Sequence, residues 1–150
     1  MRLGALANRD LTIRNFCRPG QIVIDIDGDD CLIGKQVFNM YNRLYHRNNK
    51  TWFLYTNHIR IKGSYEGDGR KIEISMGDAK QGASKSLAKQ VLKNNNYRTA
   101  DIWSTSQLRS YLFDLYVKIP FSYLIDVQEK SYYWEASDRF TMYALVELAG

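Results

Sequence analysis

The 150-residue sequence contains few of the features that mark secreted, membrane or disordered proteins. Its two cysteines, Cys17 and Cys31, are too few for a disulfide framework and lack the paired spacing of a zinc site. No apolar run approaches the roughly 18 residues of a membrane span, and the first residues do not open a signal peptide. Because 45% of the residues are hydrophobic and 25% charged, disorder is not expected. We therefore expect one domain over residues 1–150, without a transmembrane segment, in a reducing, cytoplasmic setting.

The chain also has no excess of acidic over basic residues, and its formal net charge at pH 7 is +5. A positive charge suits an anionic ligand such as a nucleotide diphosphate. It suits nonspecific contact with nucleic acid equally well. Charge therefore decides little here, and we predict no nucleic-acid partner.

Hydrophobic spacing predicts alternating helices and strands. A first helix ends before Pro19 and Gly20, and a strand at 21–26, a helix at 33–45 and a strand at 52–56 follow. The apolar run Ile22 to Ile24 is typical of a buried strand in a helix-covered parallel sheet. Residues 59–96 form an excursion expected to shape a binding site, with a weak strand at 72–74 and a short helix near 87–92. Helices at 108–119 and 140–148 complete an α/β fold with a central, mostly parallel sheet flanked by helices.

Four aspartates stand within six residues at the end of the strand at 21–26, namely Asp25, Asp27, Asp29 and Asp30. Such carboxylates repel one another, so a fold retains them only where cations or hydrogen-bond donors offset the charge. Ligands bind at the carboxyl ends of strands in α/β proteins. The cluster therefore predicts a site for Mn²⁺ or Mg²⁺. The alternative is a solvated acidic turn that caps the next helix.

Three kinds of site compete for this cluster. An EF-hand loop is excluded because Asp30 and Gln36 stand where it needs Gly and Glu, counting from Asp25. A haloacid-dehalogenase-type phosphatase would use Asp25 as nucleophile and Asp27 as acid/base, but it favours Thr or Val in place of Asp29. In a nucleotide-sugar transferase, an Asp-x-Asp pair holds a divalent ion that grips the donor diphosphate. The last two remain open on the cluster alone.

Several segments together resemble family 2 glycosyltransferases of the GT-A type. In chain order they are Gly4 to Asn8, Ile22 to Asp30, Trp52 to Tyr55, Tyr97 with Arg98, Trp103 to Arg109, Ala136 to Asp138, and Leu145 to Gly150. This resemblance covers nearly the whole chain. It implies a partial, Rossmann-like GT-A fold and an inverting, metal-dependent, hexosyltransferase-like reaction. The donor would be a nucleotide-diphosphate sugar; the sequence identifies neither the donor sugar nor the acceptor.

The resemblance also implies the roles of individual residues. Asp27 and Asp29 would bind the metal, and Asp138 would act as general base. The donor-binding residues would be Asn8, Asp27, Asp29, Asp30 and Arg109. Two alternatives remain open: Asp138 caps its helix, or Arg109 is an ordinary solvent-facing helix residue. Gln107 replaces the histidine that usually stands two residues before this arginine.

The family normally begins with strands and helices that bind the nucleobase, before the helix that carries Gly4 to Asn8. We therefore expect an incomplete donor site in this chain. This departure favours, as an alternative, a non-catalytic remnant or one half of a split glycosyltransferase that acts as a binding module. It also predicts self-association or pairing with a missing N-terminal segment, because an apolar strand left at an open edge pairs readily with other strands.

Overall fold

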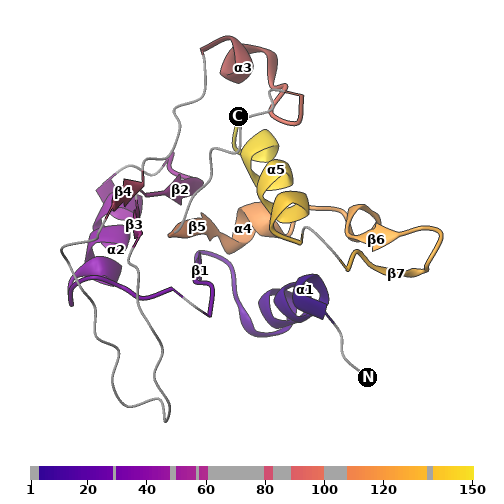
Figure 1. The fold of residues 1–150 in the computed structure, drawn as a ribbon, viewed down its shortest axis with the longest axis horizontal. Coiled ribbons are helices and arrows are strands. Elements are labelled where there is room, and N and C mark those ends of the chain that lie inside the picture. Colours follow the sequence, from indigo (N-terminus) through magenta and orange to yellow (C-terminus); the bar gives the residue numbers. More distant parts are fainter. Residues whose placement is uncertain are drawn as a thin grey trace.

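The computed structural model describes residues 4–28, 30–47, 50–56, 58–60, 80–82, 89–99, 108–134 and 137–150. Figure 1 shows the arrangement of their helices and strands. The helices are α1 (Gly4–Phe16), α2 (Val37–Arg47), α3 (Lys89–Asn94), α4 (Phe113–Tyr116) and α5 (Ser137–Ala149), with a short 3-10 helix η2 (Phe121–Tyr123). The strands are β1 (Ile22–Asp25), β2 (Phe53–Tyr55), β3 (His58–Arg60), β4 (Lys80–Gly82), β5 (Arg109–Leu112), β6 (Ile125–Asp126) and β7 (Ser131–Tyr132). Within the described ranges, no helix combines the length and the hydropathy that a membrane span requires.

The central sheet has three strands in the order β1-β5-β2, and both outer strands pair antiparallel with β5. Asp25 of β1 and Tyr55 of β2 are both register partners of Arg109. The other described strands form two antiparallel pairs, β3 with β4 and β6 with β7. The structure therefore does not support the expected parallel, Rossmann-like sheet. β1 and β2 do run in the same direction, but β5 lies between them.

Helices on both faces of the sheet explain why strand direction was mispredicted. Tyr41 and Tyr45 of α2 pack with Ile22 and Ile24 on one face. On the other face, Val23 packs against a larger core built from α1, β5, α4 and α5. A strand covered on both sides is apolar on both sides whether its neighbours run parallel or antiparallel. The apolar run of β1 thus correctly indicates that both faces of the strand are covered, but it carries no information about the direction of the neighbouring strands.

The predicted helix at 108–119 is wrong over its first half. Arg109 to Leu112 form β5, the middle strand of the sheet, and only Phe113–Tyr116 are helical as α4. The leucines at 108, 112 and 115 follow helical spacing, and this pattern misled the prediction. Pairing on both edges of β5 outweighs the local pattern, because strand preference depends strongly on context.

The remaining predicted elements agree with the structure to within a few residues. They are α1, β1, α2, β2, α3 and α5. The expected strand at 72–74 lies outside the described residues. Burial along α2 only partly follows its apolar residues: Tyr41 is buried, whereas Met40 and Leu44 are 43% and 38% exposed.

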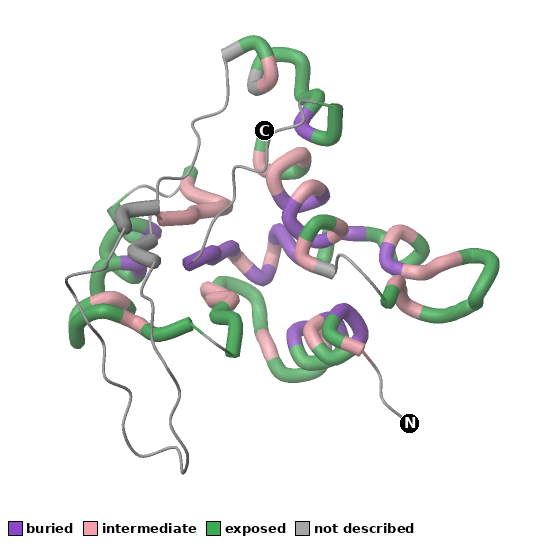
Figure 2. Tube along the Cα trace, in the orientation of Figure 1, coloured by how far each residue is buried: buried purple, intermediate pink, exposed green. Residues whose placement is uncertain are grey.

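The main core lies between α1, β5, α4 and α5, and Figure 2 shows buried positions concentrated along β5, α4 and α5. Its fully buried side chains include Leu6, Tyr111, Tyr116, Met142 and Leu145. This core anchors α1 and α5 against the sheet. As a result, the first turn of α5 is held beside the start of β5, where the predicted site residues lie.

Candidate functional site

Three of the aspartate and arginine residues singled out in the sequence meet at one end of the central sheet. Asp25 ends β1 and is the register partner of Arg109, the first residue of β5. Arg109 Nη2 lies 3.6 Å from Oδ2 of Asp138, which is in the first turn of α5. Arg109 therefore has Asp25 and Asp138, which are more than 100 positions apart in the chain, on either side of it at the end of β1 that leads into the acidic loop.

Asp25 is engaged through both of its carboxylate oxygens. Arg9 Nε of α1 lies 3.4 Å from Oδ1, and the Tyr111 hydroxyl donates a 3.0 Å hydrogen bond to Oδ2. Burial, and next the nearby charge of Asp25, raise the pKa of Tyr111, so its hydroxyl remains a donor at neutral pH. A phosphatase nucleophile must reach phosphorus, and the Asp25 side chain is only 13% exposed. This arrangement does not favour the phosphatase alternative.

The loop after β1 presents Asp27 and Asp30 to solvent. The backbone N–H of Asp30 donates to the carbonyl oxygen of Asp27 at 3.0 Å, which closes a tight turn. Asp29, the other predicted metal ligand, lies outside the described residues, as does Gln107. Among the residues described, no group of three His, Cys, Asp or Glu side chains could hold a metal ion. Exposed carboxylates on a turn suit a hard cation chemically, and metal binding stays a prediction.

Asn8 is exposed on α1, and the adjacent Arg9 reaches the end of β1 through its contact with Asp25. Asn8 therefore lies on the helix that borders this end of the sheet. Arg9 was not predicted as a site residue. Nothing in its local sequence distinguishes it from the other arginines of the chain, because its partner is on a different element.

Arg109 is 4% exposed and lies in the middle strand of the sheet. The alternative of a solvent-facing helix residue is therefore wrong on both counts. Asp138, in contrast, has 40% of its side chain exposed. Its Oδ1 accepts a 2.8 Å hydrogen bond from the backbone N–H of Arg139, and a carboxylate in the first turn stabilises the N-terminus of α5 through the helix dipole. Its exposure also leaves it accessible to a ligand, and the two roles are compatible.

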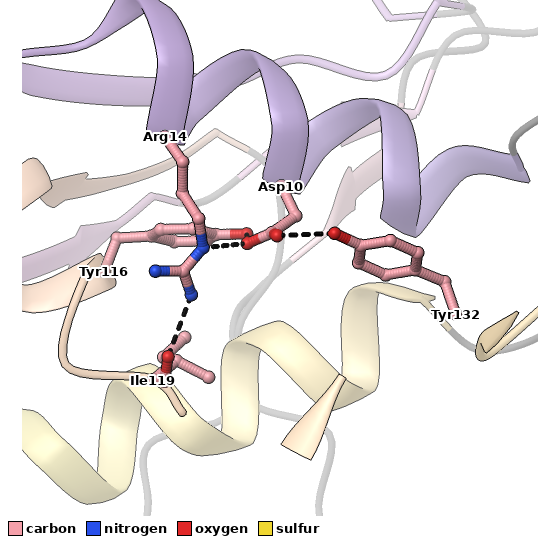
Figure 3. Close-up of polar contacts among 5 residues, drawn as sticks. All are labelled: Asp10, Arg14, Tyr116, Ile119 and Tyr132. Carbon is pink, nitrogen blue, oxygen red and sulfur yellow. Dashed lines mark hydrogen bonds and ion pairs between the residues drawn. The ribbon is translucent and has the colours of Figure 1, made fainter. Parts of the chain in front are cut away.

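A buried polar network around Asp10 was not predicted (Figure 3). Asp10 is 1% exposed and accepts hydrogen bonds from Tyr116, Tyr132 and Arg14, at 3.0, 2.8 and 2.7 Å. Arg14 also donates to the carbonyl oxygen of Ile119 at 2.8 Å. Burial and the Asp10 carboxylate raise the pKa of Tyr116, and they raise that of Tyr132 to about 12. Three elements are joined here through a carboxylate that no ligand can reach, so the network is structural.

A cavity of about 590 Å³ lies at the opposite end of β1, and its lining contains none of the predicted site residues. It is lined by Gly20, Gln21, Ile22, Asn42, Tyr45, His46, Thr51 and Leu112. Tyr45 also bonds Ser110 of β5 at 3.0 Å, and burial raises its pKa to about 12. Since the charged groups that meet in space are at the other end of the sheet, we place the candidate site there rather than in this cavity.

Comparisons with protein-family models, curated proteins and solved structures found no match to this chain. The resemblance to family 2 glycosyltransferases therefore rests on the sequence motifs themselves. Further support for a function has to come from the geometry of the site.

Proposed function

We propose that this chain is a metal-dependent glycosyltransferase that moves a sugar, with inversion, from a nucleotide-diphosphate donor to an acceptor. The observation that carries the proposal is the meeting of three segments at one end of the sheet: the turn that holds Asp27, the start of β5 and the first turn of α5. The resemblance to family 2 glycosyltransferases assigns these segments to one site. Their proximity supports a common function.

The chemistry needs one group on each side of the anomeric carbon. Asp138 would take the proton of the acceptor hydroxyl as that oxygen attacks, because its carboxylate is 40% exposed and held in place at the start of α5. Asp27, together with Asp29, would hold a Mn²⁺ or Mg²⁺ ion, which would offset the charge that develops on the departing diphosphate. Asn8 and Asp30 would border the donor from α1 and from the turn.

Isothermal titration of the full chain with UDP and GDP, with and without Mn²⁺, tests the donor site. We expect nucleotide binding that depends on the metal, and a loss of at least about tenfold in Asp27→Asn and in Asp29→Asn. Asp114→Asn is the matched control, because Asp114 is a half-buried carboxylate that accepts the Gly20 amide at 2.7 Å, away from the acidic turn. Nucleotide binding that does not depend on Mn²⁺, or no nucleotide binding at all, would contradict the proposal.

The position of β1 favours a second candidate, a non-catalytic binding module. β1 lies at an edge of the three-stranded sheet among the described residues, and an edge strand presents backbone groups that can pair with another chain. This candidate predicts self-association of the isolated chain, which light scattering measures. A monomer that hydrolyses or transfers a sugar nucleotide would eliminate it.

A further inference from the structure

We propose that Arg109 is a positioning residue for Asp138 and not a ligand of the donor. This inference rests on the proposed function and changes the role that the sequence resemblance gives to Arg109. It follows from the burial of the two side chains and from the way in which the Asp138 carboxylate is held.

Arg109 is fixed by its place in the sheet. Its backbone lies between Asp25 on one side and Tyr55 on the other, so both edges of the strand are paired at this residue. Its side chain is only 5% exposed. A donor diphosphate needs guanidinium N–H groups that face solvent, and almost none of this side chain does. The burial therefore argues against direct contact between Arg109 and the donor.

The Asp138 carboxylate is held from two directions. Its Oδ1 accepts the Arg139 backbone N–H at 2.8 Å, and its Oδ2 lies 3.6 Å from Nη2 of Arg109. The first contact is within α5, whereas the second connects α5 to the middle strand of the sheet. Arg109 thus fixes the orientation of a carboxylate that remains 40% exposed. A general base has to lie within hydrogen-bond reach of its proton, and a misplacement of about 1 Å costs roughly a hundredfold in rate.

A second arginine that pairs with a carboxylate of α5 provides a matched control. Arg98 donates to both carboxylate oxygens of Glu147, in the last turn of α5, at 2.6 and 2.8 Å. Arg98→Gln and Arg109→Gln each remove an arginine that pairs with a carboxylate of α5. Only Arg109→Gln removes a contact to Asp138.

The test measures kcat and the donor KM of the full chain with UDP-glucose, UDP-galactose and GDP-mannose plus Mn²⁺, following release of the nucleoside diphosphate. For the donor that is turned over, Arg109→Gln should lower kcat roughly a hundredfold while the donor KM changes less than about twofold. Arg98→Gln should leave both constants unchanged. The double variant Arg109→Gln with Asp138→Asn should be no slower than Asp138→Asn alone, because the arginine acts only through the carboxylate.

Each other outcome has a defined meaning. A raised donor KM with unchanged kcat would make Arg109 a donor ligand and overturn the inference, as would full activity or additive losses in the double variant. If Arg109→Gln does not fold by circular dichroism, Arg109→Lys keeps the charge but not the planar guanidinium, and the same split between kcat and KM is expected. No turnover and no Mn²⁺-dependent UDP binding by the unsubstituted chain would refute the proposed function, and this inference with it.

Discussion

Two ion pairs in this molecule join an arginine to an aspartate with opposite patterns of burial. In the Asp10 pair, the carboxylate is 1% exposed and the Arg14 side chain is 29% exposed. In the Asp138 pair, the Arg109 side chain is 5% exposed and the carboxylate is 40% exposed. In the first pair the carboxylate is buried. In the second pair the carboxylate faces solvent and its arginine partner is buried. Burial of the acid thus distinguishes a structural pair from one that can serve chemistry.

The difference has a physical basis in hydrogen bonding. A buried carboxylate is stable only when donors satisfy its oxygens, and Asp10 accepts from two tyrosines and an arginine. An exposed carboxylate can exchange water for a ligand at little cost. Asp138 is such an exposed carboxylate, and it lies beside the N-terminus of α5 and the buried guanidinium of Arg109. We therefore expect substitutions at the two aspartates to affect different properties of the protein.

The largest effect is expected from Asp10→Ala. It leaves Arg14 and two tyrosine hydroxyls without their common acceptor, so the free energy of unfolding should fall by about 3–5 kcal/mol. Urea unfolding followed by circular dichroism measures this. Asp126→Ala is the control, since Asp126 accepts the backbone N–H groups of Gln128 and Glu129 in an exposed turn. A loss below about 1 kcal/mol at Asp10 would mean that the network is not an anchor of the fold.

Asp138→Asn should show the opposite pattern. Transfer or donor hydrolysis should fall by roughly a hundredfold, which corresponds to about 2.7 kcal/mol of transition-state stabilisation. UDP binding with Mn²⁺ should be unchanged, and the free energy of unfolding should change by less than about 1 kcal/mol. Kinetics, titration calorimetry and urea unfolding of one preparation test all three. Equal losses in binding and in turnover would instead make Asp138 a metal contact or a purely structural residue.

The sequence predicts a region well when the residues that determine its structure lie close together in the chain. β1 and α5 were predictable because their apolar residues recur within the segment itself. β5 was not, since Arg109 and Ser110 are polar and become buried only through pairing with β1 and β2. The same reasoning covers the site: the acidic run is local and visible, while Arg9 meets Asp25 only in the folded chain. For Asp10, the helical neighbour Arg14 was visible, but the two tyrosines more than 100 residues away were not.

Tyr132 should produce a smaller, pH-dependent effect. Burial and the Asp10 carboxylate raise its pKa to about 12 in the folded state, against 10.0 as its ordinary value. The folded state therefore keeps a proton that the unfolded state loses, and stability present below pH 10 declines as the pH rises towards 12. Tyr132→Phe should reduce stability by about 1 kcal/mol at pH 7 and flatten the decline above pH 10. Tyr133→Phe is the control, and urea midpoints from pH 8 to 11.5 supply the data. A decline that Tyr132→Phe leaves unaltered would show that other groups cause it.

The smallest effect is expected at the far end of α5, where neither partner is fully buried. Arg98 and Glu147 are 40% and 26% exposed and form two hydrogen bonds, at 2.6 and 2.8 Å. Exposed ion pairs contribute about 0–1 kcal/mol, because water and salt screen them, although the guanidinium of Arg98 also lies 4.9 Å from the Tyr123 ring centre. Arg98→Gln should therefore reduce the free energy of unfolding by less than about 1 kcal/mol, and by less still in 1 M NaCl. A loss as large as that of Asp10→Ala would show that burial of the acid is not what makes an ion pair an anchor of this fold.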